Sequence, residues 1–241
     1  MRGVALATLV NARDTDGALS DEELVDPAVF LRSAAERVDH VDDRGHLGRR
    51  LLSEVGAVVT LFARSGFHGT SIRALAQRVG INSATLYAHY PSKEQVLADL
   101  VLIGHTELKR RLEAALAGLP PGAAADERLA ALVRAHVLLH TDFPLLAVVT
   151  NTEIHALSPE LAEPALALRA DCRGLLIDIL ERGAKDGVFR VPDILLTATA
   201  IGALGMQVAH WFGPDQPYSG TEVADVFTCL ALRAVGVPDA V

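Results

Sequence analysis

Apolar residues recur at spacings of three and four along most of the chain, and strict alternation of apolar and polar residues never persists. This period is typical of helices with one buried face, so the pattern predicts an all-α protein. From residue 93 onward, turns rich in Gly and Pro divide the pattern into a series of helices. They are predicted at 93–117, 125–140, 143–156, 159–186, 191–212 and 220–235.

Two shorter helices precede this series and are joined by a turn at Gly80. Thr70 or Ser71 can cap the first of them, because a side-chain oxygen there accepts a hydrogen bond from a free backbone N–H. Gly80 ends that helix, since glycine adopts a left-handed conformation without steric cost. Asn82 and Ser83 can cap the second helix. The pattern therefore predicts two short helices separated by a tight turn.

The second short helix leaves a polar face open, with small residues first and then hydroxyl groups and an imidazole. This is the arrangement of a helix-turn-helix, whose second helix enters the major groove of DNA by its N-terminal end. Small side chains allow close approach to base edges, and the longer polar groups can donate to phosphates. The residues predicted to contact DNA are Arg49, Thr70, Ser71, Arg73, Ser83, Ala84, Thr85, Tyr87, His89 and Lys93.

Residues 61–100, LFARSGFHGTSIRALAQRVGINSATLYAHYPSKEQVLADL, resemble the N-terminal domain of the tetracycline-repressor (TetR) family of bacterial transcription regulators. The agreement continues through the LA…G turn, the TLY helix and the YPSKE segment, and it begins at Phe62, Gly66, Phe67, Thr70 and Ser71. The resemblance implies a ligand-responsive repressor that binds a palindromic operator in double-stranded DNA. Ser83 departs from the long polar residue of many members, so the operator sequence does not follow from the resemblance.

Charge is distributed unevenly along the chain. The whole chain has a net charge of −8, yet residues 44–93 hold seven basic residues and one acidic residue, Glu54, for a net charge of +6. Such a block in an acidic protein is the footprint of a phosphate-binding face. A solvated helix face would not explain why acidic residues are scarce in this segment alone.

The composition favours packed helices in a reducing compartment. Half of the 241 residues are hydrophobic and only 5% are aromatic. Cys172 and Cys229 match no metal or redox spacing, so they are predicted to be buried thiols. No apolar run reaches the roughly 18–20 residues that span a bilayer. Residues 3–10 could pass for a signal-peptide core, but only Arg2 precedes them and an acidic stretch follows. We therefore expect a cytoplasmic protein without a membrane partner.

Three regions are predicted. Residues 1–43 form an acidic, partly disordered extension. It could pack on the body, discourage non-specific DNA contacts, or result from an upstream start assignment. Residues 44–92 form the three-helix DNA-binding domain, whose first helix ends near Ser65. Residues 93–241 form a larger helical domain for ligand binding and dimerisation, and its first helix connects directly to the DNA-binding end.

The last two predicted helices are more apolar than one buried face requires. In the TetR family such a pair forms a four-helix bundle with its twofold mate, and the resemblance implies a homodimer here. A monomer that buries both helices in its own core is the alternative. The predicted interface residues are Ile201, Leu204, Gly205, Val208, Val223, Phe227 and Leu230.

The middle helices indicate an apolar ligand pocket. The segment from His210 to Asp225, following residues 181–190, is similar to the C-terminal part of TetR-type regulators of lipid breakdown. Several of those respond to fatty acyl-coenzyme A, so the resemblance implies a small apolar ligand such as an acyl-coenzyme A or fatty acid. The predicted ligand contacts are His105, His140, Phe143, Leu146, Val149, Glu153, Met206 and Trp211.

His136 and His140 lie four residues apart and so share a helix face, a spacing that suits zinc or nickel. There is no HExxH motif and no third ligand at a fixed short spacing, so no metal or cofactor is assigned. No nucleophile–base set or glycine-rich phosphate loop is present in the sequence, and we expect no enzyme activity. The alternative function is a helical protein that binds a small molecule or metal, or an enzyme, with a vestigial DNA-binding end.

Overall fold

The computed structural model describes residues 55–237. The chain divides into two compact units, Met1–Gly56 and Ala57–Val241, and the second holds every described element apart from the first two residues of α3. The described residues form helices and no strands, which confirms the all-α prediction. The helices are α3 (Val55–Gly69), α4 (Ile72–Arg78), α5 (Ser83–His89), α6 (Lys93–Ala117), α7 (Ala125–Asp142), α8 (Pro144–Thr152), η3 (Glu153–Ala156), α9 (Pro159–Lys185), α10 (Ile194–Trp211) and α11 (Gly220–Ala234).

Side-chain caps fix where the short helices begin. The Ser71 hydroxyl accepts from the N–H of Ala74, and the Asn82 side chain accepts from the N–H of Thr85 at 2.7 Å. Between the two helices, Gly80 adopts a φ of 72°, as the turn requires. The helix-turn-helix predicted from the sequence is therefore present, with Ser71 rather than Thr70 as the first cap.

Some helix boundaries differ from the prediction. α3 extends to Gly69 as one element, but it is kinked at Gly66, which has a φ of 66°, so its first part ends near Ser65 as predicted and a short helical turn follows. The predicted helix 143–156 is divided into α8 and the short 3-10 helix η3. α10 begins at Ile194 rather than at residue 191, since the Asp193 side chain caps it by accepting from the N–H of Leu196 at 2.8 Å.

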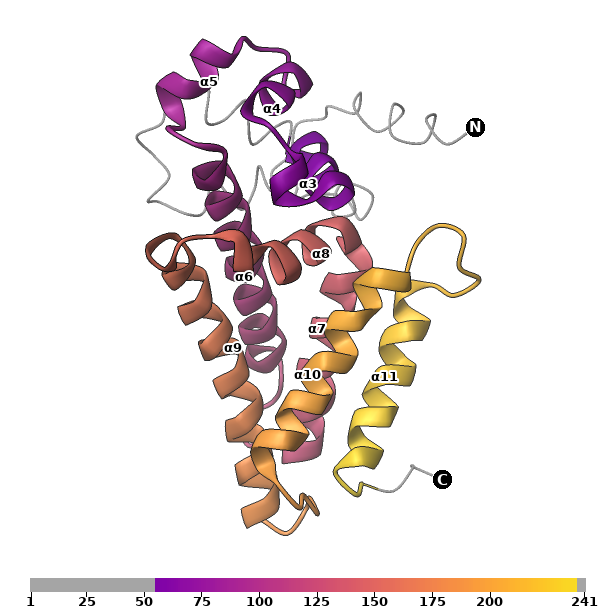
Figure 1. The fold of residues 1–241 in the computed structure, drawn as a ribbon. Helices are drawn as coiled ribbons and strands as arrows, with labels where there is room; N and C mark the ends of the chain where they lie inside the picture. The colour runs from indigo at the N-terminus through magenta and orange to yellow at the C-terminus, as the bar shows by residue number, and fades with distance from the viewer. Residues whose placement is uncertain (1–54, 238–241) are drawn as a thin grey trace. The chain divides into compact units, whose positions relative to one another are not determined.

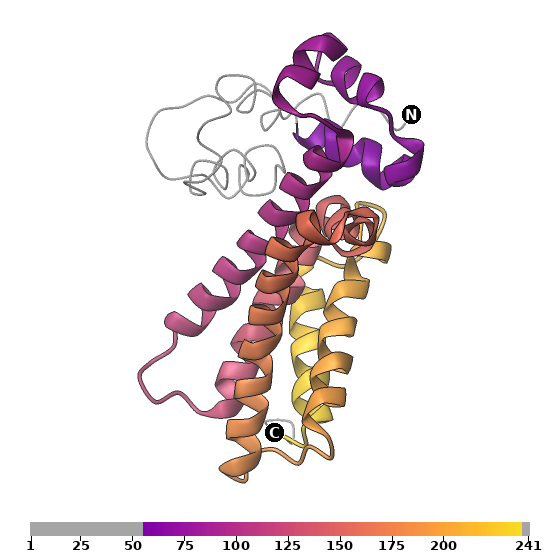
Figure 2. The same ribbon diagram turned by 60° about the vertical axis from the view of Figure 1, so that its left-hand side comes forward.

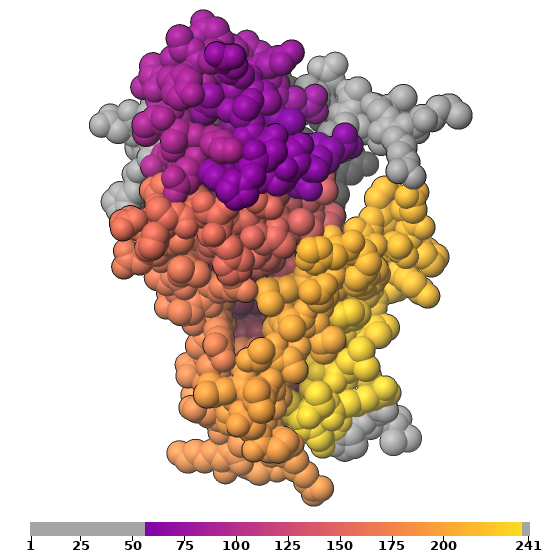
Figure 3. All heavy atoms as spheres, viewed as in Figure 1, coloured from indigo at the N-terminus to yellow at the C-terminus, as the bar shows by residue number. Residues whose placement is uncertain are grey.

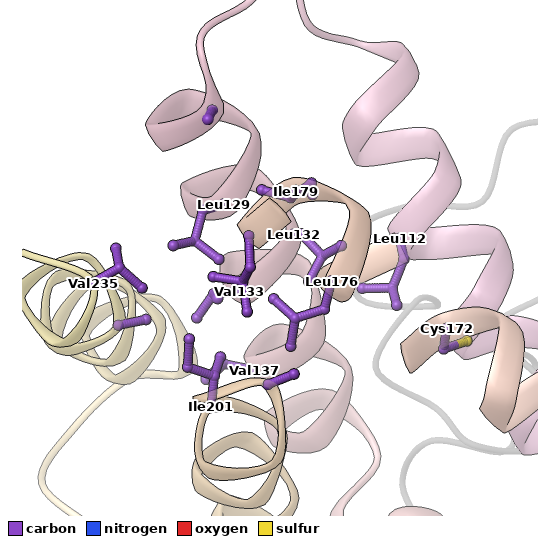
Figure 4. Close-up of a cluster of buried hydrophobic side chains, with 14 of the residues drawn as sticks. Leu112, Leu129, Leu132, Val133, Val137, Cys172, Leu176, Ile179, Ile201 and Val235 are labelled. Carbon is purple, nitrogen blue, oxygen red and sulfur yellow. The ribbon is translucent and has the colours of Figure 1, made fainter. Parts of the chain in front are cut away.

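The long helices pack around α7, which contacts α6, α9, α10 and α11 (Figures 1 and 2). Leu129, Leu132, Val133 and Val137 of α7 lie at the centre of the apolar core and meet side chains from the surrounding helices (Figure 4). Burying these side chains supplies the main driving force for this arrangement. α6 begins directly after the helix-turn-helix and runs down into this core, so one rigid element belongs to both.

Candidate functional site

The outer surface of α4 and α5 presents small and polar side chains to solvent. Ser71, Arg73 and Ala84 are exposed, and the Tyr87 ring is 52% exposed. On the other side of α5, Leu86 is fully buried against the small bundle. The recognition helix thus has one anchored face and one face free to approach a groove of DNA.

Thr70 is an exception among the predicted DNA contacts. Its side chain is only 3% exposed, and its hydroxyl donates to the carbonyl oxygen of Gly66 at 2.8 Å. This geometry stabilises the turn between α3 and α4, and it corrects the prediction that Thr70 contacts DNA. Arg49, also predicted to contact DNA, lies outside the described residues.

Lys93 is likewise engaged inside the protein. Its ammonium group donates to the carbonyl oxygens of Phe67 and Thr70, at 2.6 and 2.8 Å, and lies 4.2 Å from the centre of the Phe67 ring. These contacts join the first residue of α6 to the corner between α3 and α4. Two of the three ammonium donors are used in this way, so one is left for a phosphate, and the contact of Lys93 with DNA stays a prediction.

The remaining predicted contacts lie on or beside α5. Ser83, Thr85 and His89 are half-buried. The Thr85 hydroxyl donates to the Asn82 side chain at 2.9 Å, so it can accept a hydrogen bond from a ligand but has no free proton to donate to a phosphate. Their contacts with DNA remain predictions.

A cavity of about 400 Å³ lies in the body between α6, α7, α9 and α10. Its lining comes from those four helices and from Asn151 of α8. Figure 3 shows a hollow in the surface between α9 and α10. The cavity has the size and the mainly apolar lining of a small-molecule site. It is lined by His105, Leu108, Leu112, Leu132, His136, His140, Asn151, Leu166, Arg169, Ala170, Cys172, Arg173, Leu176, Ala198, Thr199, Gly202, Ala203 and Met206.

Three histidines gather in this cavity, and the protein holds them neutral. Burial lowers the pKa of His105, lowers that of His140 to about 4, and lowers that of His136 well below its ordinary value. The His136 and His140 rings meet edge to face, with centroids 4.6 Å apart. At neutral pH these rings are therefore uncharged hydrogen-bonding groups and supply no cation to the cavity.

Two arginines of α9 border the same cavity. A guanidinium nitrogen of Arg169 lies 3.6 Å from the Met206 sulfur, and one of Arg173 donates to the Thr199 hydroxyl at 3.3 Å. Within residues 55–237, neither arginine forms a salt bridge with a carboxylate. Their charges are therefore available to an anionic group at the side of the cavity between α9 and α10.

The DNA-binding end is joined to the body by hydrogen bonds as well as by α6. The Glu153 carboxylate of η3 accepts from the N–H of Phe67 at 2.8 Å. At the start of α6, the Glu94 carboxylate accepts from the N–H of Ser158 at 2.6 Å. Both contacts connect the helix-turn-helix region with the segment that links α8 to α9.

Comparison with known proteins decides the family. A profile described as bacterial regulatory proteins of the tetR family matches residues 49–100, and one described as the tetracyclin repressor-like C-terminal domain matches residues 122–235. A tetR-family regulatory protein from Rhodococcus RHA1, known from its crystal structure, is 30% identical to this chain in sequence. The two structures superpose over 88% of this chain and 98% of the other, with a TM-score of 0.70. The chain belongs to the TetR family. It is a helix-turn-helix transcription regulator, and the resemblance seen in the sequence is confirmed.

Other TetR-family relatives are less similar in sequence. The transcriptional repressor KstR2 of Rhodococcus jostii is 27% identical over 82% of this chain and 96% of its own length. The fatty acid metabolism regulator protein of Bacillus subtilis is 26% identical over 68% of this chain and 84% of its own length. AibR, crystallised with isovaleryl coenzyme A and operator DNA, shares the fold with a TM-score of 0.68 at 22% identity, over 75% of this chain and 97% of its own.

In this TetR-family chain, the predicted dimer residues divide into two groups. Leu204 and Leu230 are 42% and 43% exposed, so they are free to meet a second subunit. Phe227 is half-buried, with its ring centroid 6.3 Å from that of Trp211. Ile201, Val208 and Val223 are at most 4% exposed because they pack in the subunit's own core.

Gly205 also faces inward, toward α7. A β-carbon at this position would lie 2.6 Å from the His136 ring, so glycine is needed for α10 to pack against α7. The structure thus corrects four of the predicted interface positions, which are Ile201, Gly205, Val208 and Val223. Leu196 of α10 and Val226 of α11 are also exposed, at 70% and 56%.

Of the predicted ligand contacts, His105, His140 and Met206 line the cavity. The other five do not. Phe143 is buried beneath the Arg111 guanidinium, 5.1 Å from its ring centre, and Leu146 and Val149 are core residues. The remaining two are Glu153, which binds the Phe67 N–H, and Trp211, which is 40% exposed on α10.

The cavity residues missed by the sequence analysis include Arg169 and Arg173. Their spacing of four on a long helix was a usable signal, but a solvated helix face gives the same pattern. Within the described part of the chain, no three His, Cys, Asp or Glu side chains come close enough to hold a metal ion.

Proposed function

We propose that this regulator is a homodimeric repressor that acts in the cytoplasm, and that a small apolar ligand releases it from a palindromic operator. The observation that carries the proposal is the cavity of about 400 Å³ in the helical body. It is bounded by α6, whose first residue, Lys93, is hydrogen-bonded to the helix-turn-helix. A ligand in this cavity is therefore in contact with the helix that positions the DNA-binding end.

Acyl-coenzyme A thioesters are the leading candidates for the ligand. The relatives include a fatty acid metabolism regulator, and a protein of the same fold was crystallised with isovaleryl coenzyme A and operator DNA. The cavity of this chain agrees with that class, since leucines line much of it and it is bordered by two arginines that form no salt bridge within residues 55–237. The apolar wall would hold the acyl chain, and the arginines would meet the polar remainder.

A continuous set of contacts leads from the cavity to the DNA-binding end. The Asn151 amide lies 3.4 Å from Nε2 of His140 at the cavity wall. Two residues later along the chain, Glu153 holds the N–H of Phe67. α8 packs closely on α6, because a β-carbon on Gly104 would lie 2.4 Å from the Thr150 side chain. A ligand that displaces Asn151 would therefore shift the contact at Phe67.

Release requires that the ligand prefer one arrangement of the two DNA-binding ends over the other. A ligand that binds both states equally shifts nothing, and each tenfold loss of operator affinity needs about 1.4 kcal/mol of preference. The dimer supplies the two ends that a palindrome needs. Leu204 and Leu230, exposed on α10 and α11, would contribute to its interface.

Fluorescence anisotropy on a labelled fragment of the gene's own promoter tests the proposal. The protein–DNA complex is titrated with acyl-coenzyme A esters of increasing chain length, and separately with zinc and with planar aromatic cations. Release by the esters supports the proposed function. Release by zinc alone or by aromatic cations alone would contradict the ligand class.

A further inference from the structure

The orientation of the His105 ring determines which of its nitrogens carries a proton. Nδ1 lies 2.9 Å from the backbone oxygen of Val101, one turn earlier on α6. A carbonyl oxygen only accepts hydrogen bonds, so Nδ1 must be the protonated nitrogen. Burial lowers the pKa of His105 and keeps the ring neutral at neutral pH. Nε2, on the opposite side of the ring, is then a bare acceptor.

His140 is also protonated on Nδ1, but its Nε2 acceptor has a donor close by. Its Nδ1 lies 2.8 Å from the backbone oxygen of His136, and its Nε2 lies 3.4 Å from the Asn151 amide nitrogen, which can donate to it. Nε2 of His105 has no such donor among residues 55–237, but it is not one of their buried atoms without a partner, so it keeps some accessible surface at the cavity wall. An acceptor that faces a cavity and has no protein donor can accept a hydrogen bond from a ligand, and a ligand that covers it without a donor loses that bond.

His105, His140 and Asn151 lie at one end of the cavity, whereas Arg173 and Thr199 lie nearer the other end. Along α6 the lining side chain is His105 at the first of these ends and Leu112 at the other, and along α7 it is His140 at the first end and Leu132 at the other. Seven residues of helix separate the first pair, which corresponds to about 10 Å. Asn151 lines the histidine end, and Leu176 lines the leucine end. The cavity therefore suits a compact molecule with its hydrogen-bonding groups toward the histidine end and its apolar body along the leucines.

Arg169 lies near the same polar end, close enough for its charge to act on His105. Its guanidinium contacts the Met206 sulfur, a weak acceptor that leaves most of the guanidinium donors unused. Arg173 lies one turn further along α9 and borders the cavity beside Thr199. A negatively charged group of the ligand would thus be bound close to the donor that meets His105.

We propose that the cavity recognises a medium-length hydroxyacyl compound, in which a hydroxyl lies a few bonds from a carboxyl or thioester end. The hydroxyl donates to Nε2 of His105, the acyl end and its negative charge face Arg169 and Arg173, and the alkyl chain lies along Leu108, Leu112, Leu132 and Leu176. This assignment rests on the proposed function, since it names the ligand class of the same cavity.

A plain acyl chain would bury the His105 acceptor without a donor. Sites built to bond a ligand hydroxyl discriminate strongly against analogues that lack it. We therefore expect the hydroxyacyl form to bind at least about tenfold more tightly than the unsubstituted one.

Isothermal titration of the full-length wild-type protein tests the proposal without any mutation. The probes are β-hydroxydecanoic acid, decanoic acid and β-methoxydecanoic acid, each as the free acid and as the coenzyme A thioester. The methoxy compound keeps the oxygen and removes only the donor, so it should bind as weakly as the parent compound. If the hydroxy compound binds more tightly than the parent compound among the free acids, the arginines bind a carboxylate. If this preference is seen only among the thioesters, the arginines bind the phosphates of coenzyme A. Equal binding of the hydroxy and parent compounds would overturn the inference.

Substitutions at His105 and Arg169 locate the contacts. His105→Leu should remove the preference for the hydroxyl while parent compounds still bind, and His105→Gln, which retains an acceptor oxygen, should keep part of it. Arg169→Gln should weaken all anionic probes by about tenfold and leave the hydroxyl preference unchanged. Arg182→Gln, on the same helix but outside the cavity lining, is the matched control. A preference retained in His105→Leu would overturn the assignment.

The same probes, applied to the promoter complex, separate this inference from the proposed function. Release by parent and hydroxy compounds at equal concentrations would overturn the hydroxyl assignment and leave ligand-controlled repression in place. Selective binding of the hydroxy compounds without release from DNA would support the hydroxyl assignment and contradict the proposed function.

Discussion

The Glu153 carboxylate accepts a hydrogen bond from the backbone N–H of Phe67 at 2.8 Å, and so connects η3 to the corner between α3 and α4. Gly66, immediately before Phe67, has a φ of 66°, a conformation that only glycine adopts without strain. A glutamate from the ligand-binding body thus holds a turn whose geometry decides how the helix-turn-helix leaves α3.

Replacing Glu153 should weaken communication between ligand and DNA. In Glu153→Ala, we expect decanoyl-coenzyme A to bind the free protein with unchanged affinity, because Glu153 is outside the cavity lining. The ligand's effect on operator affinity should fall by about threefold to tenfold, equivalent to roughly 1 kcal/mol of coupling. Titration of ligand with and without operator measures both. Glu163→Ala, exposed on α9, is the control, and unchanged coupling in Glu153→Ala would contradict the assigned role.

The local elements could be predicted from the sequence because their signals are local. Ser71, Gly80 and Asn82 specify caps and a turn within a few residues of themselves, and the structure has them where the pattern places them. Glu153 could not be assigned in this way. Its partner is 86 residues away, and nothing in the neighbourhood of either residue indicates the contact.

The sequence also could not distinguish the dimer and ligand residues from ordinary core or surface residues, for a related reason. α10 is apolar on every side, so its sequence does not distinguish the face that packs on α7 from the face left exposed. Gly205 and Leu204 are adjacent, yet one meets His136 and the other faces solvent. Arg169 and Arg173 resembled a solvated helix surface until the fold placed them beside a cavity.

Lys93 should matter for stability, whether or not its third donor also meets a phosphate. Lys93→Met keeps most of the side chain's apolar length but loses the bonds to the carbonyls of Phe67 and Thr70. We expect a loss of about 1 to 3 kcal/mol from the free energy of unfolding, measured by urea denaturation. The slope of log affinity against log salt stays unchanged if no phosphate contact is removed.

Tyr87→Ala is the contrasting variant for this experiment. Tyr87 is 52% exposed on α5, so its loss should reduce operator affinity and have little effect on the free energy of unfolding. If the slope of log affinity against log salt falls by about one counterion in Lys93→Met, Lys93 does contact a phosphate of the operator.

A charge on the exposed apolar face of α10 and α11 should prevent dimerisation. Leu204→Glu or Leu230→Glu would place an unpaired carboxylate in the proposed interface, at a cost of several kcal/mol. Sedimentation velocity should show monomers that bind the operator poorly. Val188→Glu introduces the same charge at a residue that is 39% exposed in the loop before α10, and it should remain dimeric. A wild-type monomer at micromolar concentration would contradict the dimer.

Two glycines of α10 should respond oppositely to alanine. In Gly205→Ala the new methyl group would collide with the His136 ring at 2.6 Å, so we expect a destabilisation of about 1 to 3 kcal/mol. Gly202→Ala meets nothing within 4 Å and should stabilise the helix by about 0.5 to 1 kcal/mol. Thermal denaturation of both variants checks the pair. Equal stability of the two would contradict the close packing of α10 on α7.

The most direct test of ligand-controlled repression is reciprocity between the two sites. Decanoyl-coenzyme A is titrated into the free protein and into the protein saturated with its promoter fragment, at one salt concentration. If the ligand releases the protein from DNA, the operator must weaken ligand binding by the same factor by which the ligand weakens operator binding. The account predicts a lower affinity of the DNA-bound protein for the ligand, by tenfold or more. Equal affinities in the two titrations would contradict it.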